Sequence, residues 1–265
     1  NISPKEIFIH HPDDAYLSNL QKSQIITKII QQVEIDNHNI IDDLNELNIN
    51  EQLAENGIIM PKNSIFTKEK EIKDLLSSLS ASLSQHNKIN KIYVKSNANK
   101  EEFLIADDTV IELINAKLSL SRLTEAWIKL LFISSLKRNI KRTKVIFRTE
   151  NNYKSQIIQS PGATESNLIL EEYINIFKNY SEKCLPLPPE SSYKYVEAKI
   201  KSKNEKKAFT DKWIGNKNFS KGERDNIEMK MCFGNEKEPD FFLGNNNFDQ
   251  LSYRLYGPLI KALKK

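Results

Sequence analysis

Glycine is scarce in this sequence: 7 of its 265 residues are glycine, about 3% against roughly 7% in average proteins. Loops that hold nucleotide phosphates need glycine, because the backbone must approach the phosphate closely. The sequence contains neither G-x-G-x-x-G nor G-x-x-x-x-G-K-[ST]. These absences exclude a P-loop ATPase and a Rossmann dinucleotide-binding domain.

Cysteines and long hydrophobic runs are also few. Two cysteines, Cys184 and Cys232, are too few for a disulfide framework and favour a reducing compartment, with the cytoplasm as the expected location. No apolar run approaches the roughly 18 residues that span a bilayer, and no signal-peptide pattern opens the chain. We therefore expect no membrane partner. The chain begins at Asn1 rather than Met, which favours a fragment of a longer protein.

Charge is unevenly distributed along the chain. Residues 1–90 carry 8 basic and 13 acidic residues, a net of −5, whereas the remaining 31 basic and 22 acidic residues give +9. A basic part next to an acidic part indicates that only one of them faces a polyanion such as DNA. A compositional bias towards lysine is an equally good explanation.

Residues 1–86 are expected to form an all-helical lobe. Apolar residues recur at helical spacing in residues 23–33 and 64–83. Short helices are also expected at residues 40–47 and 51–56. Pro61 separates these from the helix at 64–83.

Residues 87–265 are expected to form a second domain, with a small sheet flanked by helices. β-branched residues and turn signals predict strands at 92–94, 102–105, 109–118, 144–148 and 153–159, and apolar periodicity predicts helices at 120–136, 164–180 and 248–263. The fold class is therefore α/β, of the α+β kind.

Residues 103–136 resemble the plan of a restriction-type PD-(D/E)xK nuclease core. In that superfamily an aspartate on one strand and the acid of an E-x-K or D-x-K tripeptide on the next hold Mg²⁺, while the lysine assists the attacking water. Asp107 or Asp108 takes the first position, and Asn115-Ala116-Lys117 takes the second. Because a neutral amide is a weak ligand for Mg²⁺, we predict a degenerate site with no catalytic residue, no metal and no cofactor.

An active Mg²⁺-dependent DNA nuclease is the alternative, if Glu112 or Glu102 supplies the missing carboxylate.

Other short matches to the nuclease motif are weaker. Glu197-Ala198-Lys199 reads as helix, where residues two apart do not share a face. Pro12-Asp13 lies far from any expected strand pair and is better explained as a helix start.

Two groups of basic residues are candidates for binding the DNA backbone. The first follows the central helix and is made of Lys137, Arg138, Lys141, Arg142 and Lys144. The second is made of Lys194, Lys199, Lys201, Lys203, Lys206 and Lys207. Such groups neutralise phosphates without reading sequence. We predict DNA binding for the first group and a solvated face for the second.

The aromatic residues favour core positions. Trp127 lies on the apolar face of its helix, so a core position is a better explanation than a base-stacking platform. Phe209 and Trp213 are expected to hold the C-terminal helices together. Phe241-Phe242 is expected to be an exposed pair that marks an interface.

The last third of the chain carries short motifs in a distinctive order. They are Glu171-Glu172-Tyr173, Cys184-Leu185-Pro186-Leu187-Pro188-Pro189-Glu190-Ser191-Ser192, Lys221-Gly222-Glu223 and Tyr256-Gly257-Pro258-Leu259. The opening Ile2-Ser3 and the His11-Pro12 step extend the similarity over the whole chain. This order resembles the C-terminal region of the RecC family, the gamma subunits of bacterial exonuclease V.

The resemblance implies a nuclease-like fold whose active site has decayed. It implies a non-catalytic scaffold in the exonuclease V (RecBCD-type) helicase–nuclease complex of DNA repair and recombination. The implied partners are the beta and alpha subunits and double-stranded DNA ends. The sequence departs from the family in its short, lysine-rich hairpin region, where relatives have longer strands with tryptophan, so no strand-splitting element can be placed on its residues.

Overall fold

The computed structural model of the chain describes residues 26–27, 62–84, 86, 89–96, 99–136, 139–216, 220–234 and 237–263. The chain forms two compact units. The first comprises Asn1–Asp107, Ile111–Leu118 and Ile146–Ser155, and the second comprises Asp108–Val110, Ser119–Val145 and Gln156–Lys265. Apart from Ile26 and Thr27, which are helical, residues 1–61 lie outside the described residues. The helices expected there, the Pro12-Asp13 step and the domain boundary at residue 86 therefore stay predictions.

The first unit is built on helix α4 (Lys62–Leu83). Its buried residues Ile72, Leu75, Leu76, Leu79 and Leu83 recur at intervals of three and four, as an amphipathic helix requires. They share one hydrophobic core with Ile26, Ile89, Ala106, Ile111, Ile146 and Tyr153. The helix expected at 64–83 is thus confirmed, and its apolar face is what holds it in the unit.

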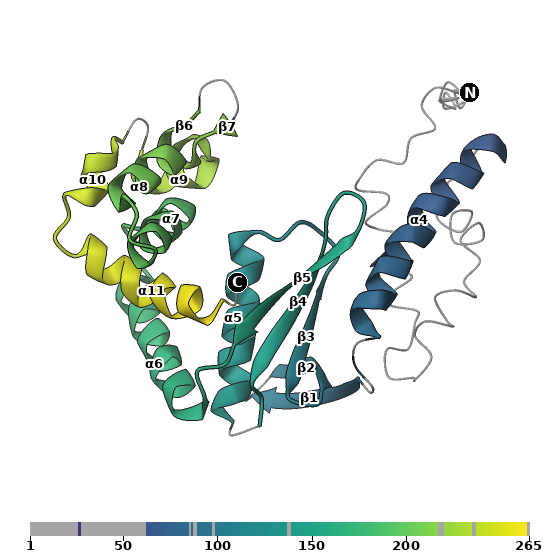
Figure 1. Ribbon diagram of the computed structural model, residues 1–265. Helices are drawn as coiled ribbons and strands as arrows, with labels where there is room; N and C mark the ends of the chain where they lie inside the picture. The colour runs from purple at the N-terminus through teal and green to yellow at the C-terminus, as the bar shows by residue number, and fades with distance from the viewer. Residues whose placement is uncertain are drawn as a thin grey trace, which may run out of the picture. The chain divides into compact units, whose positions relative to one another are not determined.

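Five strands form one sheet in the order β1-β2-β3-β4-β5 (Figure 1). Their bounds are β1 (Asn90–Ser96), β2 (Asn99–Ala106), β3 (Thr109–Ile114), β4 (Arg142–Arg148) and β5 (Tyr153–Gln159). β1 and β2 are antiparallel, with Ile92 opposite Phe103. The Lys141 N–H donates to the Asp108 carbonyl at 2.8 Å, so β3 and β4 begin side by side and run parallel.

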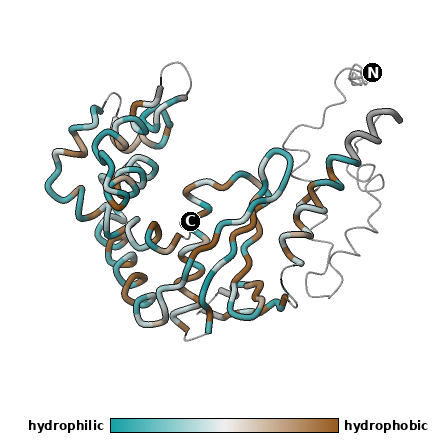
Figure 2. The backbone as a smooth tube through the Cα atoms, viewed as in Figure 1, coloured by the Kyte–Doolittle hydropathy of each residue, from teal (hydrophilic) through white to brown (hydrophobic). Residues whose placement is uncertain are grey.

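The sheet is therefore mixed, and α5 (Leu120–Ser135) forms the crossover between the parallel strands β3 and β4. Hydrophobic residues concentrate on β3 and β4 (Figure 2), where the burial of Val110, Ile111, Val145 and Ile146 is nearly complete. Together with the helices this confirms the α+β class. The predicted strand at 109–118 was too long: β3 ends at Ile114, and Asn115, Ala116 and Lys117 follow it as a bend and coil.

The second unit is mostly helical. Its remaining elements are α6 (Ala163–Tyr180), α7 (Pro189–Ile200), α8 (Glu205–Ile214), the short pair β6 (Gly215–Asn216) and β7 (Ser220–Lys221), the 3₁₀-helix η2 (Glu223–Asp225), α9 (Ile227–Phe233), α10 (Pro239–Leu243) and α11 (Phe248–Ala262). Phe209, Trp213 and Phe242 form a buried aromatic cluster between α8 and α10. α7 packs on α8 and on α11 (Figure 1).

The aromatic predictions are mostly confirmed. Trp127 is 1% exposed and Trp213 2% exposed, so both are core residues rather than stacking platforms. The Phe241-Phe242 pair is split: Phe241 is 51% exposed, but Phe242 is buried. The expectation of an exposed pair was wrong for Phe242, because successive residues of α10 point to different sides. In the described part of the chain, no helix is long and apolar enough to cross a bilayer.

Candidate functional site

Asp107 and Asp108 form the turn between β2 and β3. Asp107 adopts the left-handed conformation, with φ at +54°, which aspartate tolerates better than most residues. The Asp108 carboxylate lies 3.2 Å from the Lys141 ammonium and 3.9 Å from the Arg142 guanidinium. The hydrogen bond from Lys141 holds the pKa of Asp108 below its ordinary value, although partial burial opposes it.

Asn115 and Lys117 lie beyond the other end of β3, and both have structural contacts. The Asn115 side-chain oxygen accepts a hydrogen bond from the Tyr153 hydroxyl at 2.9 Å, and its amide nitrogen donates to Thr27 at 2.8 Å. Lys117 pairs with Glu150 at 3.3 Å on the surface. Burial raises the pKa of Tyr153, so its hydroxyl stays protonated as a donor to Asn115.

The structure does not bring the two halves of the nuclease motif together. Asp108 precedes β3 and Asn115 follows it, and six strand residues at about 3.3 Å each separate them by roughly 20 Å along the strand. Two acids that share one Mg²⁺ must both lie about 2 Å from it. Of the alternative carboxylates, Glu102 is paired with Lys91 at 3.1 Å, and Glu112 lies within β3.

The first basic group begins with Lys137 and Arg138, which lie outside the described residues. Lys141 and Arg142 are exposed, and the Arg142 Nε also donates to Thr109 at 2.9 Å. Lys144 is only 5% exposed, and burial, with the nearby Arg142 charge, lowers its pKa. A buried ammonium does not reach a phosphate, so Lys144 is removed from the predicted DNA surface. Lys141 and Arg142 remain in it, and the role of Lys137 and Arg138 stays a prediction.

Three of the six residues of the second basic group form ion pairs within the protein. Lys194 and Lys201 both bind Glu197, at 2.7 and 2.6 Å. Lys199 binds Asp249 at 2.5 Å. Glu197 and Lys199 both lie on α7, as the helical interpretation of Glu197-Ala198-Lys199 predicts, and their charges serve different ion pairs.

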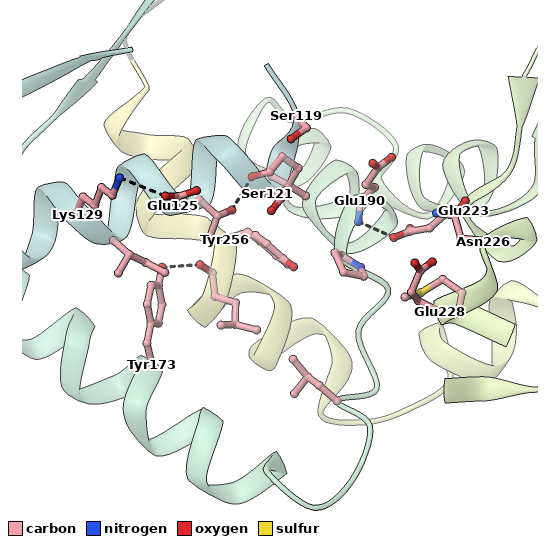
Figure 3. Close-up of a pocket in the computed structure, with 17 residues that line it drawn as sticks. Ser119, Ser121, Glu125, Lys129, Tyr173, Glu190, Glu223, Asn226, Glu228 and Tyr256 are labelled. Carbon is pink, nitrogen blue, oxygen red and sulfur yellow. Dashed lines mark hydrogen bonds and ion pairs between the residues drawn. The ribbon is translucent and has the colours of Figure 1, made fainter. Parts of the chain in front are cut away.

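A pocket of about 770 Å³ lies within the second unit (Figure 3). The start of α5, Tyr173 of α6, Leu185, the first residues of α7, η2, α9 and the middle of α11 line it. Its apolar lining residues include Leu120, Ile128, Leu185, Met229, Leu255 and Tyr256. Four glutamates also line it: Glu125, Glu190, Glu223 and Glu228.

Glu223 is the buried acid of this pocket and fixes the start of α7. Its Oε1 accepts from the Glu190 N–H at 2.8 Å, and its Oε2 accepts from the Ser191 N–H at 2.7 Å and from the Ser191 hydroxyl at 2.6 Å. The residue is 4% exposed. Because the first turn of a helix has unpaired N–H groups and a positive partial charge, α7 satisfies the buried carboxylate.

Gly222 allows Glu223 to reach that position. A Cβ atom at residue 222 would lie 2.3 Å from the Trp213 carbonyl oxygen and 2.4 Å from the Ile214 carbonyl oxygen. Both atoms belong to the backbone and cannot move aside easily. Residue 222 must therefore be glycine, because it lies so close to the backbone of Trp213 and Ile214. The motifs Lys221-Gly222-Glu223 and Pro189-Glu190-Ser191 thus meet in space.

A short chain of hydrogen bonds supports the opposite side of the pocket. The Trp127 Nε1 donates to the Tyr173 hydroxyl at 3.1 Å, and this hydroxyl donates to the Leu255 carbonyl at 2.7 Å. Burial raises the pKa of Tyr173 to about 12, against the opposing effect of the Trp127 hydrogen bond. Burial and the Glu223 charge raise the pKa of Tyr256. Both phenols stay neutral, so the negative charge of the pocket comes from its carboxylates.

Sequence reasoning did not predict this pocket. Its lining comes from segments between Ser119 and Tyr256, and no single segment carries a recognisable signature. The one signal in the sequence is the pair of motifs around Ser191 and Glu223, and neither motif by itself identifies the other as its partner.

The fold is thus of the α+β class, and Asp108, Asn115 and Lys117 each contact other residues of the chain. The chain matches the family model of the RecC C-terminal domain over residues 67–200, about half of its length. It belongs to this family, and membership implies involvement in the RecBCD complex, exonuclease V, and in DNA repair and recombination. A comparison with curated proteins finds no match to the chain.

Glu223→Gln tests the contact between η2 and α7. Glutamine keeps the shape, but it removes the charge and turns an amide towards N–H donors, so we expect a loss of about 2 kcal/mol or more in the free energy of unfolding. Urea denaturation followed by circular dichroism measures it. Glu228→Gln, on the exposed rim, is the matched control and is expected to change stability by less than about 0.5 kcal/mol. Equal effects of the two changes would contradict the role given to Glu223.

Asp108→Asn tests the ion pair with Lys141. Since folding lowers the pKa of Asp108, its stabilisation is present above the unfolded-state pKa of about 4 and is lost as the pH falls through the folded-state pKa. The partly exposed pair contributes less than about 1 kcal/mol. We expect the variant to be less stable than the wild type at pH 7 and equal to it near pH 2. Asp107→Asn is the control. If Asp108→Asn were still less stable than the wild type at pH 2, the ion pair would not be the cause of the difference in stability.

Proposed function

We propose that this chain is a non-catalytic scaffold domain of the exonuclease V helicase–nuclease complex in double-strand break repair. In this function it binds the beta and alpha subunits and contacts the DNA backbone. Family membership supports the setting. The proposal depends most on one observation, the pairing of Asp108 with Lys141 and Arg142 instead of a second carboxylate.

The pairing supports a non-catalytic role for electrostatic reasons. A magnesium site gathers carboxylates around the cation. Asp108 has the opposite arrangement: two cationic side chains surround one carboxylate. Their positive charges repel a divalent cation from the same place. Asn115 and Lys117 have their own partners beyond the far end of β3.

The proposed DNA contact is made by Lys141 and Arg142. Together with Asp108 they carry a net charge of +1, and the side chains of Lys141 and Arg142 are both exposed. A small exposed surface of this kind neutralises one or two phosphates and does not read base sequence. It therefore assists a complex that holds DNA mainly through other subunits.

The test of the scaffold function is co-elution from gel filtration with separately expressed beta and alpha subunits at moderate salt. We expect a stable complex that contains the chain and all the subunits. Mg²⁺- or Mn²⁺-dependent cleavage of linear DNA by the chain alone, lost in Lys117→Ala, would overturn the non-catalytic part. A folded chain that elutes alone would overturn the scaffold part.

The DNA contact is tested by salt dependence. Each phosphate contact contributes about 0.9 to the slope of log K against log salt concentration, so Lys141→Gln with Arg142→Gln should lower the slope by up to about 2. Fluorescence anisotropy of a labelled duplex with the assembled complex measures it. Lys206→Gln with Lys207→Gln, on the surface of α8, is the control. An unchanged slope in the first variant, with thermal unfolding intact, would contradict the contact.

A further inference from the structure

The pocket of the second unit is lined by apolar residues, and one of them is open to solvent. Ile128 is 42% exposed, a large fraction for an isoleucine beside a buried core. α9, which contributes Met229 and Glu228 to the lining, also exposes Ile227 (70%) and Met231 (82%), one helical turn apart. Several exposed apolar side chains beside a formed pocket are typical of a protein-binding site.

The charges of the pocket select what can enter. Its lining holds four glutamates and one lysine, Lys129. Glu125 pairs with Lys129 at 3.2 Å, and Glu190 pairs with Lys212. Within the described part of the chain, Glu228 has no ion-pair partner and is exposed at the edge (Figure 3). A negative lining repels DNA phosphates and attracts lysine or arginine.

The shape favours a few side chains rather than a domain surface. A volume of about 770 Å³ lies in the range of pockets that enclose a compact group. The walls are helices α5, α7, α9 and α11. Grooves between helices commonly receive one face of an amphipathic helix, whose apolar residues enter while its charged residues meet the rim.

We propose that this pocket is the docking site for a segment of a partner subunit in which hydrophobic side chains are flanked by lysine or arginine. Leu120, Ile128 and Met229 receive the apolar side chains, and Glu125 and Glu228 bind the basic ones. The proposal rests on the scaffold function and adds to it the place and the chemistry of one contact. It separates two surfaces of the second unit: the acidic pocket binds protein, and the Lys141–Arg142 surface binds DNA.

Photo-crosslinking in the assembled complex tests the docking site. p-Benzoylphenylalanine replaces Ile128 in the full chain, which is assembled with the exonuclease V beta and alpha subunits and irradiated. Mass spectrometry then identifies the linked peptide. We expect one partner segment that contains apolar residues and lysine or arginine. The same probe at Leu168, which is exposed on α6 and does not line the pocket, is the control and should not link that segment.

Charge reversal provides the second measurement. Glu125→Lys with Glu228→Lys should weaken assembly about tenfold or more and abolish the crosslink from residue 128. Glu171→Lys, on an exposed turn of α6, is the control and should leave both unchanged. Circular dichroism checks that each variant is folded.

The outcomes separate the two proposals. A complex that assembles normally without a crosslink from residue 128, or with a link to DNA, to a second copy of the chain or to an acidic segment, overturns the docking site and leaves the scaffold function standing. Failure of the folded wild-type chain to assemble overturns both. Assembly that is unaffected by reversal of Glu125 and Glu228 overturns the charge selection.

Discussion

The second unit depends on the contact between the Glu223 carboxylate and the first turn of α7. Pro188 and Pro189 have no N–H, so the first unpaired donors of that helix are those of Glu190 and Ser191, and Glu223 accepts from both. A carboxylate that is 4% exposed would be unstable without such donors. Helix and carboxylate therefore stabilise each other, and this fixes α7 against η2.

The position of α7 determines the rest of the unit. Tyr195 and Val196 on its inner face pack into the aromatic core with Phe209 and Phe248, so a displaced α7 would expose these side chains to water. Loss of such burial costs about 1.5–3 kcal/mol for each large side chain, more than any surface ion pair contributes. The polar contact thus sets the geometry, whereas the hydrophobic core supplies most of the stability.

The sequence predicted the elements better than it predicted the sites. Helix periodicity located α5 and α6 to within about one residue, because the local pattern and the burial agree there. The strand prediction failed after Ile114, where the Asn115 amide bonds to Tyr153 and Thr27. Lys144 counts as a surface charge in a one-dimensional sequence, but it is buried because both faces of β4 are covered over residues 143–146. The pocket depends on contacts between distant segments, which no local pattern encodes.

The glutamates of the pocket are more informative about function than the many lysines of the same part of the chain. Basic residues outnumber acidic ones by nine after residue 90, so an exposed lysine in this region carries little information about function. Four glutamates against one lysine in a single pocket run against that trend. Burial requires hydrogen-bond partners for Glu223, whereas Glu228 is exposed in the first turn of α9, where the helix dipole favours a negative charge by only about 0.3–1 kcal/mol. Within the described residues no ion pair occupies the Glu228 carboxylate, so it is available to a basic group that comes from outside the chain.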